Sequence, residues 1–209
     1  DLSKKNILIA GSLPPQNGTY VEDDRKISFL KKDFKEQAEL IKPYVDFLYF
    51  DVFSGGKEVE AACEAVEKMN VPVLVGLHIK KNGKLHSGES ISEIVKKFKS
   101  NNWIGIIGAC VSLEIIKKTL NEFKKSNLPF GFKANLWKID EPLPVNKFNT
   151  AKYNEEGKNP SDILGIRSEV DEKEFKNFSK EIMRQGATIL GGCCNVSPIH
   201  INELKSLRS

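Results

Sequence analysis

Residues 189–198 read Ile-Leu-Gly-Gly-Cys-Cys-Asn-Val-Ser-Pro and combine the end of an apolar strand with the start of a helix. Ser197 followed by Pro198 is typical of an N-cap and a first helical position. The positive end of that helix would face Cys193 and Cys194 and favour their thiolate forms. The alternative is that the two cysteines are small buried hydrophobic side chains at a strand end, because unpaired Cys is among the most buried residue types.

A second apolar run, residues 103–110, also ends in a cysteine, Cys110, and a helical pattern follows it from Ser112. In a parallel sheet the carboxyl ends of the strands share one rim, so Cys110 is expected beside Cys193 and Cys194. Three thiols with one open position are the arrangement of a catalytic zinc site, whereas structural sites are usually closed by four ligands. The sequence therefore predicts a zinc site with these three cysteines as ligands.

The remaining cysteine, Cys63, lies in a helical pattern in which Val59 and Val66 share its face. A small thiol on an apolar helix face is usually part of the core. We therefore interpret Cys63 as a core residue and not as a ligand.

Composition and charge narrow the class of protein. The chain has 209 residues, of which 40% are hydrophobic, so it can bury a core as a single domain over residues 1–209. The net charge is +4, but the lysines are spread along helical patterns among Asp and Glu, which indicates solvated faces and no nucleic-acid groove. No apolar run approaches the roughly 20 residues that a membrane span needs. Reactive thiols suit a reducing compartment, so a cytoplasmic location is expected.

Apolar runs alternate with amphipathic helical patterns along the chain, which favours βα units around a parallel sheet. Six strands are expected, over residues 7–13, 45–52, 71–77, 103–108, 129–134 and 187–191. The helices are expected to begin near Ser28, Gly56, Ser90, Ser112, Asp171 and Ser197. Ser90 with Glu93 fits a capping box. Residues 136–170 form a long connection, typical of a functional lid or a partly disordered segment.

Further groups at the expected carboxyl ends of the strands are Ser12, Asp51, His78 and Asn135. Asp51 is the only charge in its apolar run, and the alternative to a functional role is that it caps a loop. His78 precedes Ile79-Lys80-Lys81, which returns to solvent, so a satisfied or exposed histidine is the simpler interpretation. His86 and His200 are expected to be structural.

These residues resemble the homocysteine S-methyltransferase family, which includes betaine-homocysteine and S-methylmethionine-homocysteine methyltransferases and the homocysteine module of cobalamin-dependent methionine synthase. Gly-Gly-Cys-Cys at residues 191–194 is the specific motif. Order and spacing match across essentially the whole chain. The other segments that carry the resemblance are residues 10–15, 50–52, 83–90, 107–110, 134–135 and 197–201.

The resemblance implies a (β/α)8 barrel that holds zinc through Cys110, Cys193 and Cys194. Homocysteine would place its sulfur at the open position, and a small donor would transfer a methyl group to it to give methionine. A coordinated thiol is deprotonated, and a thiolate is the nucleophile that this transfer needs. Asp51, Asn135 and Ser12 are the expected substrate-binding residues, with Asp51 at the amino group.

The chain departs from the family pattern in three places. Ala109 stands where the family usually has Asn, and Asp51 where it normally has Glu. The match also begins at the third strand of the barrel, so the first two βα units are missing from it. Six strands at barrel curvature would leave two unpaired edges.

We expect the chain to be part of a longer protein. The alternatives are that another polypeptide supplies the missing units, or that the sheet of a degenerate member stays open. A homo-oligomer or a complementing N-terminal segment would cover the edges. Two other functions remain open, a noncatalytic zinc-binding module and thiol redox chemistry at Cys193 and Cys194.

Overall fold

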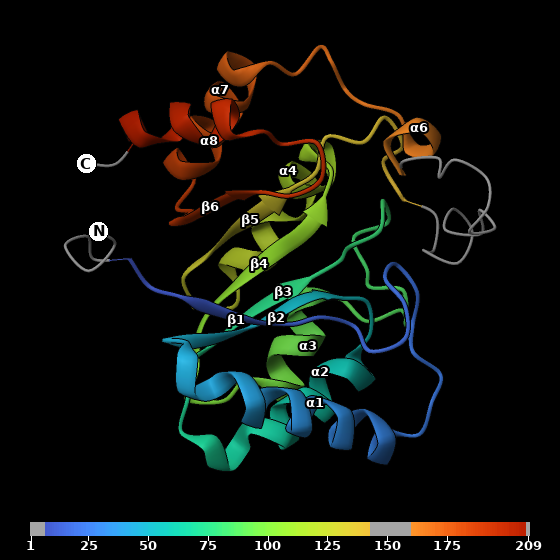
Figure 1. The fold of residues 1–209 in the computed structure, drawn as a ribbon. Coiled ribbons are helices and arrows are strands. Elements are labelled where there is room, and N and C mark those ends of the chain that lie inside the picture. The colour runs from blue at the N-terminus through green and yellow to red at the C-terminus, as the bar shows by residue number, and fades with distance from the viewer. Residues whose placement is uncertain (1–6, 143–159, 208–209) are drawn as a thin grey trace, which may run out of the picture.

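The computed structural model describes residues 7–142 and 160–207. Within these ranges, parallel strands form one six-stranded sheet in strict chain order. The strands are β1 (Ala10–Leu13), β2 (Phe47–Phe53), β3 (Val73–Leu77), β4 (Trp103–Val111), β5 (Phe130–Ala134) and β6 (Ile189–Gly192). The order never reverses, as it would in a doubly wound sheet. The sheet is therefore a half-barrel, six consecutive strands of the (β/α)8 type, as the sequence predicts (Figure 1).

Helices cover one face of the half-barrel (Figure 1). They are α1 (Ile27–Ile41), α2 (Gly56–Val66), α3 (Ile91–Phe98), α4 (Leu113–Lys124), α7 (Glu172–Arg184) and α8 (Pro198–Leu204), with short 3-10 turns at Lys42–Tyr44, Glu67–Met69 and Lys205–Leu207. The short α6 (Pro160–Leu164) lies apart from this face (Figure 1), and its Leu164 packs in the same small cluster as Tyr20 and Cys110. The six expected helix starts are confirmed to within one residue. The short helix α6, inside the long connection, was not predicted; residues 143–159 of that connection lie outside the described ranges. None of the helices described has the length and apolar character that a bilayer span requires.

The main core lies between the sheet and these helices. Phe50 and Phe53 of β2 are fully buried there, with Phe34 of α1 packed on Phe53 at a ring-centroid distance of 5.2 Å. Side chains alternate along a strand, so the neighbours of Phe50, namely Tyr49 and Asp51, face the opposite, concave side. The concave side of the half-barrel is thus available for chemistry.

Both sheet edges are open within the described residues, because β1 pairs only with β2 and β6 only with β5. The expected first strand, residues 7–13, is too long: it is strand only from Ala10. Residues 7–9 precede the start of the neighbouring β2, so no further ladder forms there, although Asp46 N donates to Ile9 O at 2.8 Å. Ile7, Leu8 and Ile9 are 50%, 69% and 56% exposed. This edge therefore presents an apolar run with no covering strand.

Capping interactions fix where the helices start. The predicted box of Ser90 and Glu93 forms at α3, and Asp171 accepts from the backbone at the start of α7. At α2 the fully buried Glu58 accepts hydrogen bonds from Ser54 N (2.8 Å) and Gly55 N (3.1 Å). Burial raises the pKa of Glu58 to about 7 despite these two bonds.

This pKa predicts a pH dependence of stability. Between the unfolded value of 4.5 and about 7 the native Glu58 keeps a proton that the unfolded chain releases, so the free energy of unfolding should fall as pH rises through this window. The total change is at most roughly 3 kcal/mol. Urea unfolding of Glu58→Gln at several pH values should show this slope removed.

Glu93 gives a control of opposite sign. Its exposed carboxylate accepts from Ser90 N, which lowers its pKa, so its stabilisation is present above pH 4.5 and is lost as pH falls. Glu93→Gln should remove stability at neutral pH and leave the Glu58 slope in place. An unchanged slope in Glu58→Gln would contradict the assignment.

Candidate metal centre and substrate site

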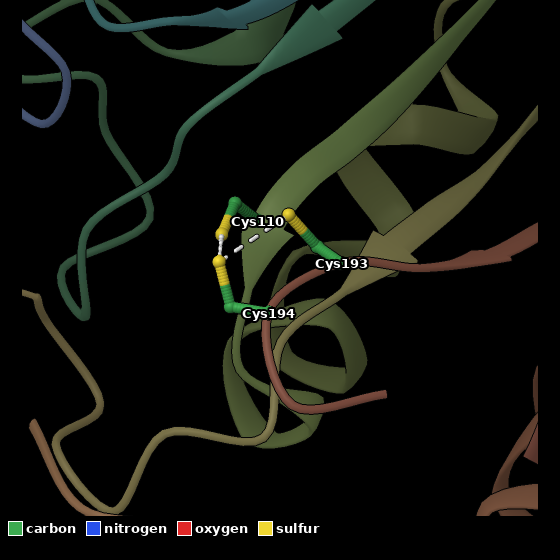
Figure 2. A group of neighbouring side chains, drawn as sticks. All are labelled: Cys110, Cys193 and Cys194. Carbon is green, nitrogen blue, oxygen red and sulfur yellow. Dashed lines mark hydrogen bonds between the residues drawn. The ribbon is translucent and has the colours of Figure 1, made fainter. Parts of the chain in front are cut away.

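Three cysteines meet at the carboxyl ends of β4 and β6, as the sequence predicts. Cys110 lies near the end of β4, and Cys193 and Cys194 follow β6 directly. The Sγ atom of Cys194 lies 3.7 Å from that of Cys110 and 3.8 Å from that of Cys193. Figure 2 shows the sulfur atoms turned toward one another. All three thiols are free.

The sulfur spacing fits a tetrahedral metal. Zn–S bonds of about 2.3 Å at tetrahedral angles place two ligand sulfurs about 3.8 Å apart. The two measured separations, 3.7 and 3.8 Å, agree with this value, and all three ligand atoms lie within 4.8 Å of one another. Three thiolates leave one coordination position open. The cluster is therefore consistent with a zinc site.

Backbone strain aims the side chains at this site. Cys110 has a φ of 53°, next to a register shift in the β4–β5 ladder. Val52 has a φ of 63° within a similar shift between β2 and β3, although a β-branched residue rarely adopts positive φ. Both belong to a small cluster that Cys193 and Cys194 pack against. Bulges that redirect side chains and strained backbone concentrate at functional sites.

Two polar side chains hold Cys110. The Tyr20 hydroxyl, from the loop after β1, lies 3.0 Å from Cys110 Sγ. Asn135 is fully buried, and its side-chain amide donates to the Cys110 carbonyl oxygen at 2.6 Å and lies 3.8 Å from Cys110 Sγ. The structure thus places the Asn135 side chain in contact with both the backbone and the thiol of Cys110. Tyr20 was missed by the sequence analysis, because nothing local marks a tyrosine in a polar loop as a neighbour of residue 110.

The expectation that helix α8 favours thiolates is wrong for the metal-free thiols. The hydrogen bond with Cys110, with burial and the nearby Cys110 charge, raises the pKa of Cys193 to about 12. At Cys110 the bond from Cys193 lowers the pKa, but the bond with Cys194 and burial outweigh it and raise it to about 11. Burial and neighbouring ionisable thiols disfavour the charged form of each thiol. A bound cation reverses this balance.

The histidines are not among the side chains that group as metal ligands in the described residues, although His78 Nδ1 lies 3.4 Å from the Ala109 carbonyl oxygen, next to Cys110. His78 is 1% exposed, so it is buried and is not a solvent-facing strand end. Its ring is tilted against that of Tyr20 at a centroid distance of 4.6 Å and stacks on that of His86 at 5.5 Å. Burial lowers the pKa of His78 to about 3, so it stays neutral. His200 accepts from Ser197 N at 3.1 Å and caps α8, the structural role expected for it.

Asp51 projects from the concave face of β2 and already has partners. Lys133 Nζ of β5 lies 2.6 Å from its Oδ1, and Ser12 Oγ donates to its Oδ2 at 3.5 Å. Lys133 also lies over the Tyr49 ring, 5.1 Å from its centroid. The structure therefore brings Ser12 and Asp51 together and adds Lys133, which the sequence analysis did not single out.

Comparison with known proteins agrees with this geometry. The family model for homocysteine S-methyltransferase matches residues 1–207. The chain belongs to the homocysteine S-methyltransferase family. It is 28% identical over 211 residues to S-methylmethionine–homocysteine S-methyltransferase BHMT2 of Pongo abelii, covering 96% of this chain and 54% of that protein. Betaine–homocysteine S-methyltransferase 1 of Bos taurus is also 28% identical, over 184 residues, covering 84% of this chain and 43% of that protein.

A solved structure of this family has the same fold. The metallated form of the homocysteine methyltransferase MmuM from Escherichia coli superposes with a TM-score of 0.72 at 16% identity, covering 99% of this chain and 64% of that one. The chain spans about half the length of the curated relatives it matches. As a homocysteine S-methyltransferase family member, it therefore has the thiol cluster within only part of the barrel.

Cys63 is separate from this centre. It is half-buried on α2, packs against the main core, and its Sγ lies 4.0 Å from the Phe98 carbonyl oxygen. Its interpretation as a core residue is confirmed by this placement.

A glycine makes room for the aromatic ring beside Asp51. A Cβ on Gly76 of β3 would lie 2.6 Å from the Tyr49 hydroxyl and 2.8 Å from the Phe50 carbonyl oxygen. We expect Gly76→Ala to lower the free energy of unfolding by about 1–3 kcal/mol, because the backbone contact cannot yield. Urea unfolding measures this change. Gly108→Ala on β4 is the matched control, since its Cβ would meet nothing closer than 3.7 Å. Equal effects of the two substitutions would contradict the role of Gly76.

Proposed function

We propose that this chain binds zinc through Cys110, Cys193 and Cys194 and serves the transfer of a methyl group from a small-molecule donor to the thiol of homocysteine, giving methionine. The observation that carries the proposal is the spacing of the three sulfur atoms, which fits tetrahedral zinc in a chain of this family. The Escherichia coli homocysteine methyltransferase MmuM, which has the same fold, has a solved metallated form, and this supports metal binding by the fold.

Zinc, when bound, would supply Lewis acidity that keeps the homocysteine sulfur as a nucleophilic thiolate at neutral pH. The chain's own residues would orient the reactants. Tyr20 and Asn135 fix Cys110, and partners of this kind set the orientation of a metal ligand. Asp51 and Ser12 lie on the concave side, where they would bind the amino acid end of homocysteine. Asn135, whose amide lies 3.8 Å from Cys110 Sγ, would contact the substrate beside that thiol.

We further propose that residues 1–209 form one homocysteine-binding barrel domain that is completed by two more βα units. The open edges of β1 and β6 and the exposed Ile7, Leu8 and Ile9 support this. A complementing N-terminal segment or a second copy of the chain would cover them. The free thiols suit the cytoplasm, and no nucleic-acid or membrane partner is proposed.

A noncatalytic zinc-binding module is the second candidate. The half-barrel favours it, because all three thiols lie within this chain, while both edges of the sheet are unpaired in the part of the chain that the structure describes. Such a module would bind metal but would not align homocysteine with a donor.

The proposed function predicts the metal content of the chain. The purified chain should bind about one zinc, and Cys110→Ser, Cys193→Ser and Cys194→Ser should each lose most of it, because two thiolates hold the ion far less tightly than three. Elemental analysis after exhaustive dialysis measures this. Cys63→Ser is the control and should keep its zinc. Equal retention in all four variants would remove the metal proposal.

The proposed function also predicts when methyl transfer should occur. This chain alone should form no methionine from homocysteine with S-methylmethionine, betaine or S-adenosylmethionine, because open edges leave thiolate and methyl donor unaligned. Joined at its N-terminus to two βα units of a family relative, it should become active with one of these donors. Turnover by the monomeric 209-residue chain would overturn the need for completion. Activity in neither form would favour the noncatalytic module.

A further inference from the structure

The six strands contain only two charged residues in the described structure, Asp51 of β2 and Lys133 of β5. Their side chains are 21% and 23% exposed and form an ion pair at 2.6 Å. Strands β2 and β5 are not neighbours, since β3 and β4 lie between them. The pair therefore reaches across the concave face instead of running along one ladder.

The pair lies beside the thiols. Lys133 precedes Ala134, whose carbonyl oxygen accepts from Cys193 N at 2.7 Å. Burial lowers the pKa of Lys133, but the nearby Cys193 thiol and the Asp51 carboxylate outweigh it and raise the pKa, so the lysine stays charged. Any ligand whose sulfur reaches the three thiols from the concave side passes these two opposite charges.

We propose that Lys133 is the anchor for the α-carboxylate of the amino acid substrate, while Asp51 takes its α-ammonium group. The inference rests on the proposed function and names a residue that the motifs of the chain do not. Homocysteine carries its two charges on one carbon, two methylenes from the sulfur. Exchanging the Asp51–Lys133 ion pair for two pairs with a zwitterion leaves the net charge of the site unchanged, so neither side chain is left buried and unpaired.

Binding of the substrate by Asp51 alone does not fit this ion pair. If Asp51 alone bound the substrate, its strong existing partner Lys133 would compete with the ammonium group at every encounter. A substrate that brings its own carboxylate satisfies Lys133 in exchange. The site should therefore select thiols that carry both charges over thiols that carry one.

Binding of three thiols to the cobalt(II)-loaded protein tests this selectivity, because the sulfur-to-metal absorption changes when a thiol binds the metal. The thiols are L-homocysteine, 3-aminopropanethiol, which lacks the carboxylate, and 4-sulfanylbutanoate, which lacks the ammonium group. Lys133→Gln should weaken homocysteine and 4-sulfanylbutanoate at least tenfold and leave 3-aminopropanethiol unchanged or tighter. Asp51→Asn should weaken homocysteine and 3-aminopropanethiol and spare 4-sulfanylbutanoate. Lys133→Arg keeps the charge and should restore much of the homocysteine binding.

The outcomes separate this proposal from the proposed function. If neither the cobalt-loaded chain nor its form extended by two βα units responds to homocysteine, the proposed function fails and the anchor role fails with it. If the chain responds, two results show that the pair is structural and that the anchor role is wrong. In the first, Lys133→Gln leaves the affinities for all three thiols unchanged. In the second, it lowers all three alike, and Lys133→Arg restores only the free energy of unfolding. The crossed pattern of losses supports it.

Discussion

The strict chain order of the six parallel strands is the constraint on which the rest of this molecule depends. Because each crossover leads to the next strand, every carboxyl end lies on one rim, and groups as distant in sequence as Cys110 and Cys194 come within 3.7 Å. The same order gives the sheet its curvature and leaves β1 and β6 as edges. One topological rule thus gathers the thiols and also leaves the sheet unclosed.

The rim departs from regular strand geometry where the chemistry lies. Register shifts in β2 and β4 accompany positive φ at Val52 and Cys110, and both residues join the small cluster around Tyr20. A regular strand would alternate these side chains between core and concave face. Strain of this kind persists only where surrounding packing determines it, and Asn135, bonded to the Cys110 carbonyl oxygen, provides one such constraint.

Much of this arrangement follows from the sequence, because strands of the parallel core are apolar runs and helix starts carry capping residues such as Ser90 and Asp171. The cysteine cluster follows from the same reasoning, since strand ends share a rim. Tyr20 and Lys133 do not, because their roles depend on contacts with residues 110 and 51, across elements that no local pattern connects. The extent of β1 could not be predicted either. The strand begins at Ala10, where its pairing with Phe47 of β2 begins, and not at the start of the apolar run.

The two halves of the proposed function, metal binding and alignment of the substrates, are physically separable in this chain. Metal binding needs only Cys110, Cys193 and Cys194 with the groups that orient them, and Tyr20 and Asn135 lie in the same half-barrel. Alignment of two substrates needs a closed, water-excluding wall, and among residues 7–142 and 160–207 that wall ends at β1 and β6. The Asp51–Lys133 ion pair bears on both functions. Both residues belong to the described half-barrel, but about one fifth of each side chain is exposed on its open concave side. Closing the barrel would desolvate this pair further, and that would strengthen its attraction for a ligand carrying both charges while raising the cost of admitting one that carries a single charge.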